Sequence, residues 1–411
     1  MVSLAIGSTR PCGFAGLAAV ILLASSCNRA DNDDNNNSTK TALSARLPSA
    51  AVDQAAWELF AKAVTPSAVA GKVSFETWAS DQDIYVNNPC PPGSGPSAGC
   101  NVPTWPAGAG LAAAKSLQTS LLGLSHGKAS LKGGKTIQTI GPAQPCIPRT
   151  DKDAGFPSGK YACVGEEVRR DRASFDYIVG NGLWSLAGLK AFFGTAKEVA
   201  FPNDSLQIKA DWIPVSALAK WLGKDAAFVT ANFYTANASL KAGDAPTAIA
   251  MTSMHVAVKT AQFPNWIWAN FENAYTPGRC DETGCVDGFG ARQPTIPASA
   301  QTWGQYGACP KTSAAQSLLS AAKAPAIFAN YCLTGTQTEF GTTANPTRLG
   351  SPVIEPLNAG VPLAQSSCIS CHVGASFTAS GFNFPNDNLG PNAVPKGARG
   401  YDFMWGLLGA N

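Results

Sequence analysis

Five consecutive residues near the C-terminus combine two thiols and an imidazole at a spacing that can do chemistry. They are Cys368-Ile369-Ser370-Cys371-His372. Two thiols three positions apart can both reach the vinyl groups of one porphyrin and form thioether bonds, and the adjacent histidine is then delivered to the iron. The motif therefore predicts one covalent haem c, attached through Cys368 and Cys371, with His372 as the proximal iron ligand.

Two other chemistries use the same residue types. A dithiol redox site should open a helix inside a βαβ unit with much of the domain still to come, yet only the Pro- and Gly-rich stretch 373–411 follows His372. A zinc site would need a second Cys/His pair at finger spacing, and the sequence has none. Covalent haem is therefore the preferred interpretation.

The sixth iron ligand has two candidates. We expect Met404, because a Gly- and Pro-rich loop separates it from His372 and can pass round the haem edge to the opposite face. Its aromatic neighbours also suit a sulfur packed in a core. His255, on a strand candidate, is the alternative distal ligand, and a five-coordinate iron is the remaining option. His126 lies at the presumed end of a helix, where a histidine is more often a cap or dipole partner.

The residues before the motif contain helical and strand patterns. Helical spacing predicts one helix capped by Asp53, with Trp57, Phe60, Ala61 and Val64 on one face, and a second over Leu111–Leu124. Alternation of period two predicts strands over Leu206–Trp212, Val229–Tyr234 and Ala248–Lys259. Helices first and strands later favour an α+β body with a C-terminal, loop-rich, cytochrome c-like haem-binding segment.

The N-terminus has the features of an export signal. Arg10 is its only charged side chain, and the apolar run 13–24 is too short to span a membrane permanently. The small residues before Cys27 resemble the lipobox of bacterial lipoproteins, in which the cysteine is diacylated. An ordinary cleaved signal with an incidental Cys27 is the alternative, since Ala24 stands where leucine is most common. The Asn/Asp-rich stretch 28–40 cannot bury enough apolar surface to fold.

These patterns divide the chain into four parts. We expect a signal peptide over 1–26, a lipidated cysteine with a disordered tether over 27–48, the α+β body over 49–335 and the haem-binding segment over 336–411. Prolines interrupt the last part on both sides of the motif, so it is expected to wrap around an apolar mass such as haem. The protein is predicted to be a cell-envelope lipoprotein at the periplasmic or outer-membrane face, held to the membrane by lipid on Cys27.

Composition and cysteine usage support export and exclude one class of partner. The net charge is only +3, and no block of Lys or Arg provides a nucleic-acid footprint. Eight of the 12 cysteines lie outside the signal, the lipobox and the motif. In an oxidising compartment the simplest pairing joins sequence neighbours. The expected disulfides are Cys90–Cys100, Cys146–Cys163, Cys280–Cys285 and Cys309–Cys332.

The motif, with the small residues Gly374 and Ala375 after it, resembles the c-type cytochromes. Further segments resemble motifs of a group of secreted bacterial cytochrome c proteins without an assigned activity: Trp57–Phe60 with Phe75–Trp78, His255–Thr260, and Pro264–Trp268 with Phe271 and Glu272. The resemblance implies haem and brings no substrate with it. For Trp266, Trp268 and Phe271, packing in the core is the preferred role.

The expected function is electron transfer by a monohaem cytochrome in the cell envelope, with an unidentified redox partner protein. The alternative is a haem-dependent oxidoreductase, peroxidase- or oxidase-like, with its substrate pocket in the α+β body and His255 as a polar distal group. A binding protein with a structural haem is a third option. A simple shuttle needs only about 100 residues, whereas about 300 lie between the expected tether and the motif, and the sequence assigns those residues no role.

Overall fold

The structure is a computed structural model. It describes residues 50–86, 101–107, 115–116, 147–148, 161–162, 165–195, 197–239, 245–292, 304–342, 345–353, 355, 363, 366–378, 381–383, 394 and 397–409. The expected signal peptide, Cys27, the tether, His126 and the cysteines at 90, 100, 146 and 163 lie outside these residues. Ser44–Asn411 forms one compact unit.

The helices are short. The α-helices are α1 (Ala50–Ala63), α4 (Arg172–Gly180), α5 (Leu186–Gly194), α6 (Val215–Leu222), α7 (Ala226–Asn232), α8 (Ser313–Ala321) and α9 (Cys368–Val373). Single turns of other helix types are η1 (Ser74–Thr77), η2 (Gln82–Val86), η4 (Ala326–Asn330) and η7 (Trp405–Gly409). Among the described residues, no helix has the length and apolar character needed to cross a membrane.

The strands are β1 (Ala79–Ser80), β2 (Lys115–Ser116), β3 (Ile147–Pro148), β4 (Tyr161–Ala162), β5 (Gly165–Arg170), β6 (Leu206–Pro214), β7 (Thr235–Ser239), β8 (Thr247–Val258), β9 (Ile267–Asn273), β10 (Tyr331–Gln337), β11 (Gly341–Thr342), β12 (Asn345–Pro346), β13 (Ser376–Thr378), β14 (Gly381–Asn383) and β15 (Arg399–Gly400). The presence of both helices and an antiparallel sheet makes the fold α+β.

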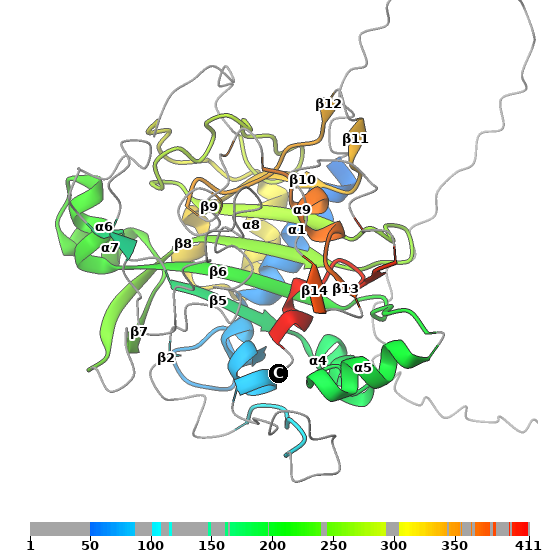
Figure 1. Cartoon of the computed structure of the whole chain (residues 1–411). Coiled ribbons are helices and arrows are strands. Elements are labelled where there is room, and N and C mark those ends of the chain that lie inside the picture. Colours follow the sequence, from blue (N-terminus) through cyan, green and yellow to red (C-terminus); the bar gives the residue numbers. More distant parts are fainter. Residues whose placement is uncertain are drawn as a thin grey trace, which may run out of the picture. The chain divides into compact units, whose positions relative to one another are not determined.

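A large twisted sheet forms the centre of the molecule (Figure 1). Its strands follow the order β1-β5-β6-β8-β7-β2, and β8 also pairs with β9, which pairs with β10. The long strand β8 pairs with three strands. Along one edge its first half pairs with β7 and its second half with β9, and along the other edge it pairs with β6. The pairings are antiparallel except for β2 with β7. Strands β6, β8 and β9 therefore provide a rigid platform.

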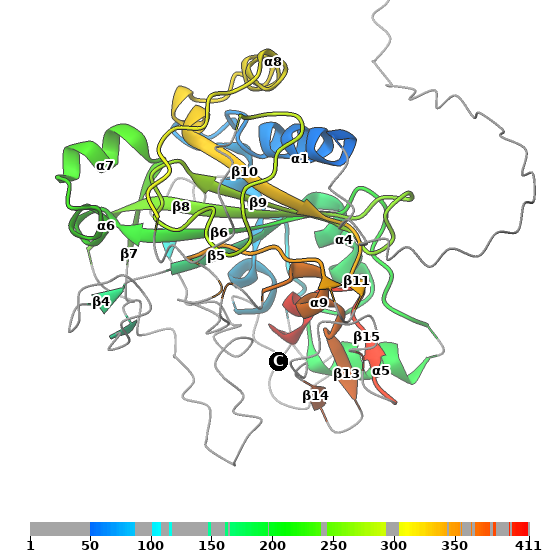
Figure 2. The same cartoon turned by 90° about the horizontal axis from the view of Figure 1, so that it is seen from above.

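One face of this platform is apolar and is covered by α1. Trp57 and Phe60 on α1 are fully buried, and the ring of Phe60 stacks on Phe271 of β9 at 4.2 Å between centroids. Leu206 and Ile208 of β6 belong to the same core. Figure 2 shows α1 and α8 on this side of the sheet and α9 with β13 and β14 on the other.

The opposite side carries a second core, formed where the C-terminal segment meets the sheet. Trp266, just before β9, and Trp268 within it pack there with Ile369 of α9 and with Met404 and Trp405. The expected core role of Trp266, Trp268 and Phe271 is thus confirmed, since all three are at most 5% exposed. Residues on both sides of position 335 share this core, so the C-terminal segment packs directly on the body.

Several sequence predictions can be compared with the elements. The strands expected over 206–212 and 248–259 are confirmed as β6 and β8, and the first helix as α1. Asp53 does not cap that helix, because α1 begins at Ala50 and Asp53 lies inside its first turn. The strand expected over 229–234 is wrong: residues 226–232 form α7, whose N-cap Asp225 accepts a hydrogen bond from the Phe228 backbone N–H.

The second expected helix, over 111–124, lies mostly outside the described residues. Lys115 and Ser116, the two residues of that range that are described, form β2 and pair in parallel with β7. At these two positions the helix prediction is wrong. At Lys115 and Ser116, backbone pairing with the edge strand β7 determines the conformation, although the surrounding apolar residues are spaced as in a helix.

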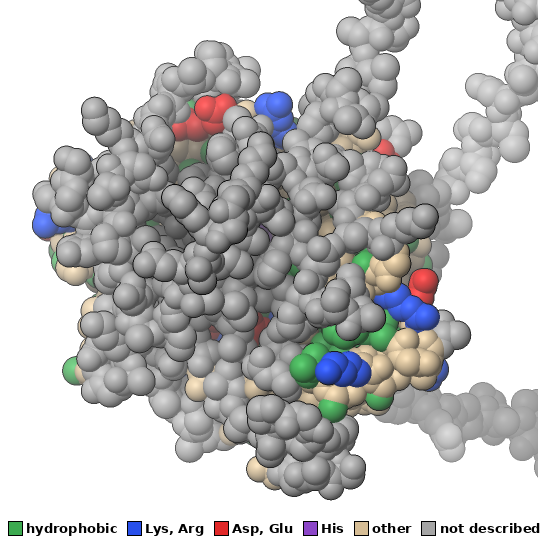
Figure 3. Space-filling model, in the orientation of Figure 1, with side chains coloured by type: hydrophobic (Ala, Val, Ile, Leu, Met, Phe, Trp, Pro, Cys, Tyr) green, Lys and Arg blue, Asp and Glu red, His purple; other side chains and the backbone are tan. Residues whose placement is uncertain are grey.

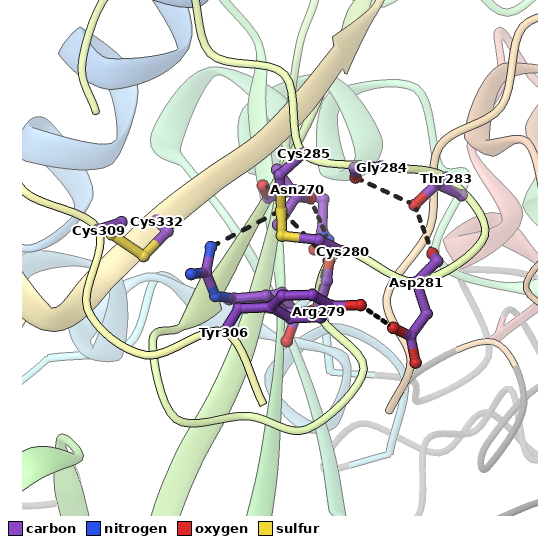
Figure 4. The surroundings of a disulfide bond; sticks show 12 residues. Asn270, Arg279, Cys280, Asp281, Thr283, Gly284, Cys285, Tyr306, Cys309 and Cys332 are labelled. Carbon is purple, nitrogen blue, oxygen red and sulfur yellow. Dashed lines mark hydrogen bonds between the residues drawn. A yellow bond between two sulfur atoms is a disulfide. The ribbon is translucent and has the colours of Figure 1, made fainter. Parts of the chain in front are cut away.

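Two disulfides are present in the described part of the chain, and both are pairs expected from the sequence. Cys280–Cys285 closes a tight loop after β9, and Cys309–Cys332 joins the segment before α8 to β10. Figure 4 shows the Arg279 side chain beside the first disulfide. The Arg279 Nη2 also donates to the Gly307 carbonyl at 2.9 Å. The first disulfide therefore constrains a short loop, and the second ties the segment before α8 to the sheet.

The surface near α5 carries basic side chains. Lys190 on α5 and Lys197 beyond it are exposed. In Figure 3, Lys and Arg side chains adjoin apolar side chains in this region of the visible face. Arg399 of β15 links the C-terminal segment to this region, since its Nη1 donates to the backbone carbonyl of Thr195 at 2.7 Å.

Candidate functional site

The short helix α9 carries the Cys-x-x-Cys-His motif, and β10 fixes where this helix begins. Ser367 is its N-cap and accepts from the Ser370 backbone N–H. Gln337, the last residue of β10, accepts from the Ile369 N–H at 2.9 Å and donates to the Ser367 Oγ at 2.9 Å. One glutamine amide therefore holds the first turn of α9 against the sheet.

Both motif cysteines are free thiols in the structure. Cys368 is buried and its Sγ donates to the Leu349 carbonyl at 3.6 Å, whereas Cys371 is half-buried. Burial raises the pKa of the Cys371 thiol to about 11 and raises the pKa of Cys368 in the same direction. Because the spacing is three residues on a helix, the two thiols lie on neighbouring positions of one face.

The His372 imidazole is held in one tautomer. Its Nδ1 lies 2.8 Å from the backbone carbonyl oxygen of Phe403. A carbonyl can only accept, so Nδ1 carries the proton and Nε2 keeps its lone pair. Burial lowers the pKa of His372 to about 4, which keeps the ring neutral at pH 7. A neutral imidazole with Nδ1 bound to a carbonyl is the form in which histidine binds metals.

A tight turn near the C-terminus presents that carbonyl. Asp402 and Phe403 both have left-handed backbone conformations, with φ of 52° and 69°. The Asp402 carboxylate pairs with Lys259 and accepts from the Phe201 backbone N–H at 2.7 Å. Two body elements therefore fix the turn that orients His372.

Two tryptophans complete the surroundings of α9. The Trp405 Nε1 donates to the Cys371 carbonyl at 3.0 Å. The Trp268 ring, from β9, lies 4.3 Å from the His372 ring between centroids. The motif is thus enclosed by one aromatic side chain from the tail and one from the body.

Met404 is buried at 3% exposure in the core beside α9. It directly follows Phe403, whose carbonyl faces the Nδ1 of His372. Its backbone therefore begins on the Nδ1 side of the imidazole and away from Nε2. His255, the other candidate ligand, lies on β8, and its imidazole is close to the Cys368 Sγ and the Glu355 carboxylate.

The sheet face below the motif is polar, although it is buried. Lys209, His255 and Asn270 are register partners across β6, β8 and β9. The Asn270 amide nitrogen donates to the carbonyl oxygen of Gly350 at 3.1 Å, which holds the 350 loop on the sheet. The alternation over 206–212 predicted a half-buried strand, and residues of the C-terminal segment, among them Glu355 and Cys371, lie near the Lys209 side chain on its polar face.

A second row of polar residues lies beside the first. Glu166, Asp211, Ser253 and Glu272 are successive register partners across β5, β6, β8 and β9. Asp211, Ser253 and Glu272 are all fully buried. Among the residues that the structure describes, neither carboxylate oxygen of Asp211 nor the Ser253 Oγ has a hydrogen-bond partner. Unpartnered polar atoms at such depth are uncommon outside functional sites.

Burial changes the protonation of these acids. It raises the pKa of Glu272 to about 8 and that of Glu355 to about 7, and it raises the pKa of Asp211 well above its ordinary value. Lys209 opposes this effect at Glu355 and forms an ion pair with Glu166 at 2.8 Å. The face therefore holds several protons that a solvent-exposed face would have lost at neutral pH.

Three donor atoms of different types converge where this face meets α9. The His255 Nε2 is 3.9 Å from the Glu355 Oε1. One nitrogen of His255, one carboxylate oxygen of Glu355 and the Cys368 Sγ all lie within 4.8 Å of one another. Burial, with Lys209 and His372 nearby, lowers the pKa of His255 well below its ordinary value, so its imidazole is neutral.

Sequence reasoning found the motif residues, His255 and Met404, but missed Lys209, Asp211 and Glu355. Lys209 and Asp211 belong to the polar face of a strand that the sequence predicts to be half-buried. The one sequence feature that indicates a special role for them is that two charged residues lie on a strand that also carries a tryptophan and several aliphatic residues. Glu355 lies in an irregular, proline-rich stretch and had no local signal.

Comparison with known proteins brings no relative. No protein-family model, no curated protein and no solved structure matches this chain.

Proposed function

We propose that this protein is a monohaem c-type cytochrome in which Cys368 and Cys371 bind the haem covalently and His372 is the proximal iron ligand. The observation that carries the proposal is the hydrogen bond from His372 Nδ1 to the Phe403 carbonyl, which leaves Nε2 free to coordinate. The two unpaired thiols lie on the same short helix as this histidine. These residues fit a haem c.

Electron transfer in the cell envelope is the leading function. A bound haem c supplies a reversible one-electron couple. The protein residues hold the proximal imidazole neutral, orient it through Phe403 and shield it with Trp268. The protein would exchange electrons with an unidentified redox partner protein, and a lipid on Cys27 would keep the carrier at the membrane surface.

The C-terminal segment would then be a cytochrome c-like element that uses the body as its second wall. Support comes from the shared core of α9, the final turn and the start of β9. A large body that provides the distal surface gives the residues before the motif a role.

Replacement of both cysteines tests the covalent bond. Haem should remain with the wild-type protein after acid–acetone extraction and should be lost from Cys368→Ala/Cys371→Ala, since both thioethers are absent. Ser370→Ala is the matched control, because it changes the same helix and keeps the motif. Haem that stays attached in the double variant would refute the proposal.

A haem-dependent oxidoreductase is the second candidate, and one observation favours it. The sheet face opposite α9 presents a half-buried Lys209 and His255 and a row of buried acids that electron transfer alone does not require. Polar groups of this kind could bind and protonate a small reactant next to the haem. Carbon monoxide separates the two functions: binding to the ferrous protein indicates an open iron position, whereas a carrier with six ligands leaves the spectrum unchanged.

A further inference from the structure

His255, Glu355 and Cys368 come from three separate parts of the chain and bring a nitrogen, an oxygen and a sulfur donor together. These atoms lie within 4.8 Å of one another. Metal–ligand bonds of about 2.0–2.3 Å place neighbouring donors of a tetrahedral site roughly 3.3–3.8 Å apart. The three side chains therefore need to close by only ~1 Å to share one ion.

The donor set selects a class of metal. A neutral imidazole, a carboxylate and a thiolate suit zinc and similar borderline ions, while calcium and magnesium require mainly oxygen ligands. Three protein ligands with a fourth position left open is also the usual composition of a reactive zinc site. His255 Nε2 has no hydrogen-bond partner among the residues that the structure describes.

The surroundings favour a cation. Asp211 lies in the neighbouring row of the sheet, fully buried, with both carboxylate oxygens unpartnered within the described part of the chain. Glu166 and Glu272 share that row; Lys209 pairs with Glu166, and Arg279 is the cation that acts on Glu272. A divalent ion would offset this excess of buried acidic groups.

We propose that the haem-free chain binds one zinc-class divalent ion through His255, Glu355 and Cys368. The site goes beyond the proposed cytochrome function. Both would use the Cys368 sulfur, so that sulfur can serve only one of them at a time. A haem thioether on Cys368 removes the thiolate, which is the form of cysteine that binds zinc. Metal and haem therefore exclude each other at Cys368, and bound metal should block haem attachment there.

The experiment titrates the full chain, produced without haem attachment and with Cys368 and Cys371 kept reduced, with Zn²⁺ alone. Calorimetry should give one ion per chain. His255→Ala, Glu355→Gln and Cys368→Ser should each weaken binding about tenfold or more. Cys371→Ser is the matched control and should bind Zn²⁺ like the wild type. Bound Zn²⁺ should also protect Cys368, but not Cys371, from alkylation as mapped by mass spectrometry.

Several results would overturn the proposal. They are absence of binding in the wild type, unchanged affinity in His255→Ala, or equal loss in Cys371→Ser and Cys368→Ser, which would assign the ion to the dithiol. Thermal unfolding of each apo variant shows whether a loss of affinity comes from loss of the fold. Acid–acetone extraction of the haem-loaded protein is independent of these results, so failure of the zinc site leaves the cytochrome proposal standing.

Discussion

The Nδ1 of His372 lies 2.8 Å from the carbonyl oxygen of Phe403, a residue 31 positions later in the chain. The orientation of the motif histidine therefore depends on a turn at the far end of the C-terminal segment. Asp402 fixes that turn through Lys259 and the Phe201 backbone N–H. A positioning residue outside the motif should thus control the properties of His372.

Asp402→Ala should loosen this turn. Loss of a largely buried carboxylate that serves Lys259 and Phe201 should lower the free energy of unfolding by about 2–4 kcal/mol. In the haem-loaded protein it should also shift the reduction potential, because the hydrogen bond to the proximal histidine tunes its basicity. Urea unfolding and potentiometry measure the two effects. Asp176→Ala, at an exposed pair with Arg172, should change neither. Equal behaviour of the two variants would contradict the role of Asp402.

The sixth ligand can be read from the oxidised spectrum. The sequence favoured Met404, but its backbone starts on the Nδ1 side of His372, whereas His255 Nε2 has no partner among the described residues. We therefore expect His255→Ala to change the spectrum and Met404→Ala to leave it unchanged. A weak long-wavelength band that disappears in Met404→Ala would instead establish methionine ligation.

Glu272→Gln should change how stability depends on pH. Burial raises the pKa of Glu272 to about 8 from its ordinary 4.5, so the native state favours the protonated carboxyl. Its stabilising contribution is complete below about pH 4.5 and is lost as the pH rises through 8. The glutamine variant has no such loss, so its stability relative to wild type should increase by roughly 2–5 kcal/mol between pH 4.5 and 8.5. Parallel stability curves for the two proteins would show that Glu272 is ionised in the native state.

Asp53→Ala should destabilise the contact between α1 and the rest of the body. The buried carboxylate accepts from Thr336 Oγ1 at 2.6 Å and from the Gly288 backbone N–H at 2.7 Å. Its removal leaves both donors unpaired and should cost about 2–4 kcal/mol in urea unfolding. The neighbouring variant Gln54→Ala changes an exposed side chain and should stay within about 0.5 kcal/mol of wild type. Similar costs for both variants would exclude a specific role of Asp53.

Cys27→Ser tests the lipid anchor. A diacylated Cys27 would hold the protein in the membrane fraction, and serine at this position should release it into the soluble periplasmic or culture fraction. Mass spectrometry of the mature N-terminus provides the direct readout. Wild-type protein that is already soluble and begins at another residue would contradict lipidation.

The alternating strands could be predicted from the sequence, but the environment of their polar face could not. Leu206, Ile208 and Ala210 face the α1 core as expected, while Asp211 on the other face is also buried. That burial arises from a segment more than a hundred residues later in the chain, and local periodicity carries no information on it. Val229 and Phe233 fit two patterns in the sequence. They alternate with polar residues as in a strand, but they are also four residues apart, as on one face of a helix. In the structure Val229 of α7 and its C-cap Phe233 are buried in the same core.

The site was predictable only where chemistry and sequence spacing coincide. The motif lies in five residues and was found at once. The Phe403 carbonyl belongs to the backbone and gives no sequence signal, and Glu355 meets His255 only through the tertiary fold. Partners contributed by loops and main-chain atoms require the structure.

The order of these elements along the chain limits when the motif thiols can be modified during folding. Strands β5 to β10 all precede α9, so a chain that emerges N-terminus first can finish its platform before the thiols arrive. Once the tail has docked, Cys368 is only 8% exposed. An enzyme that modifies this thiol therefore has access to it only before the C-terminal segment packs on the sheet. After packing, modification requires the segment to dissociate from the sheet.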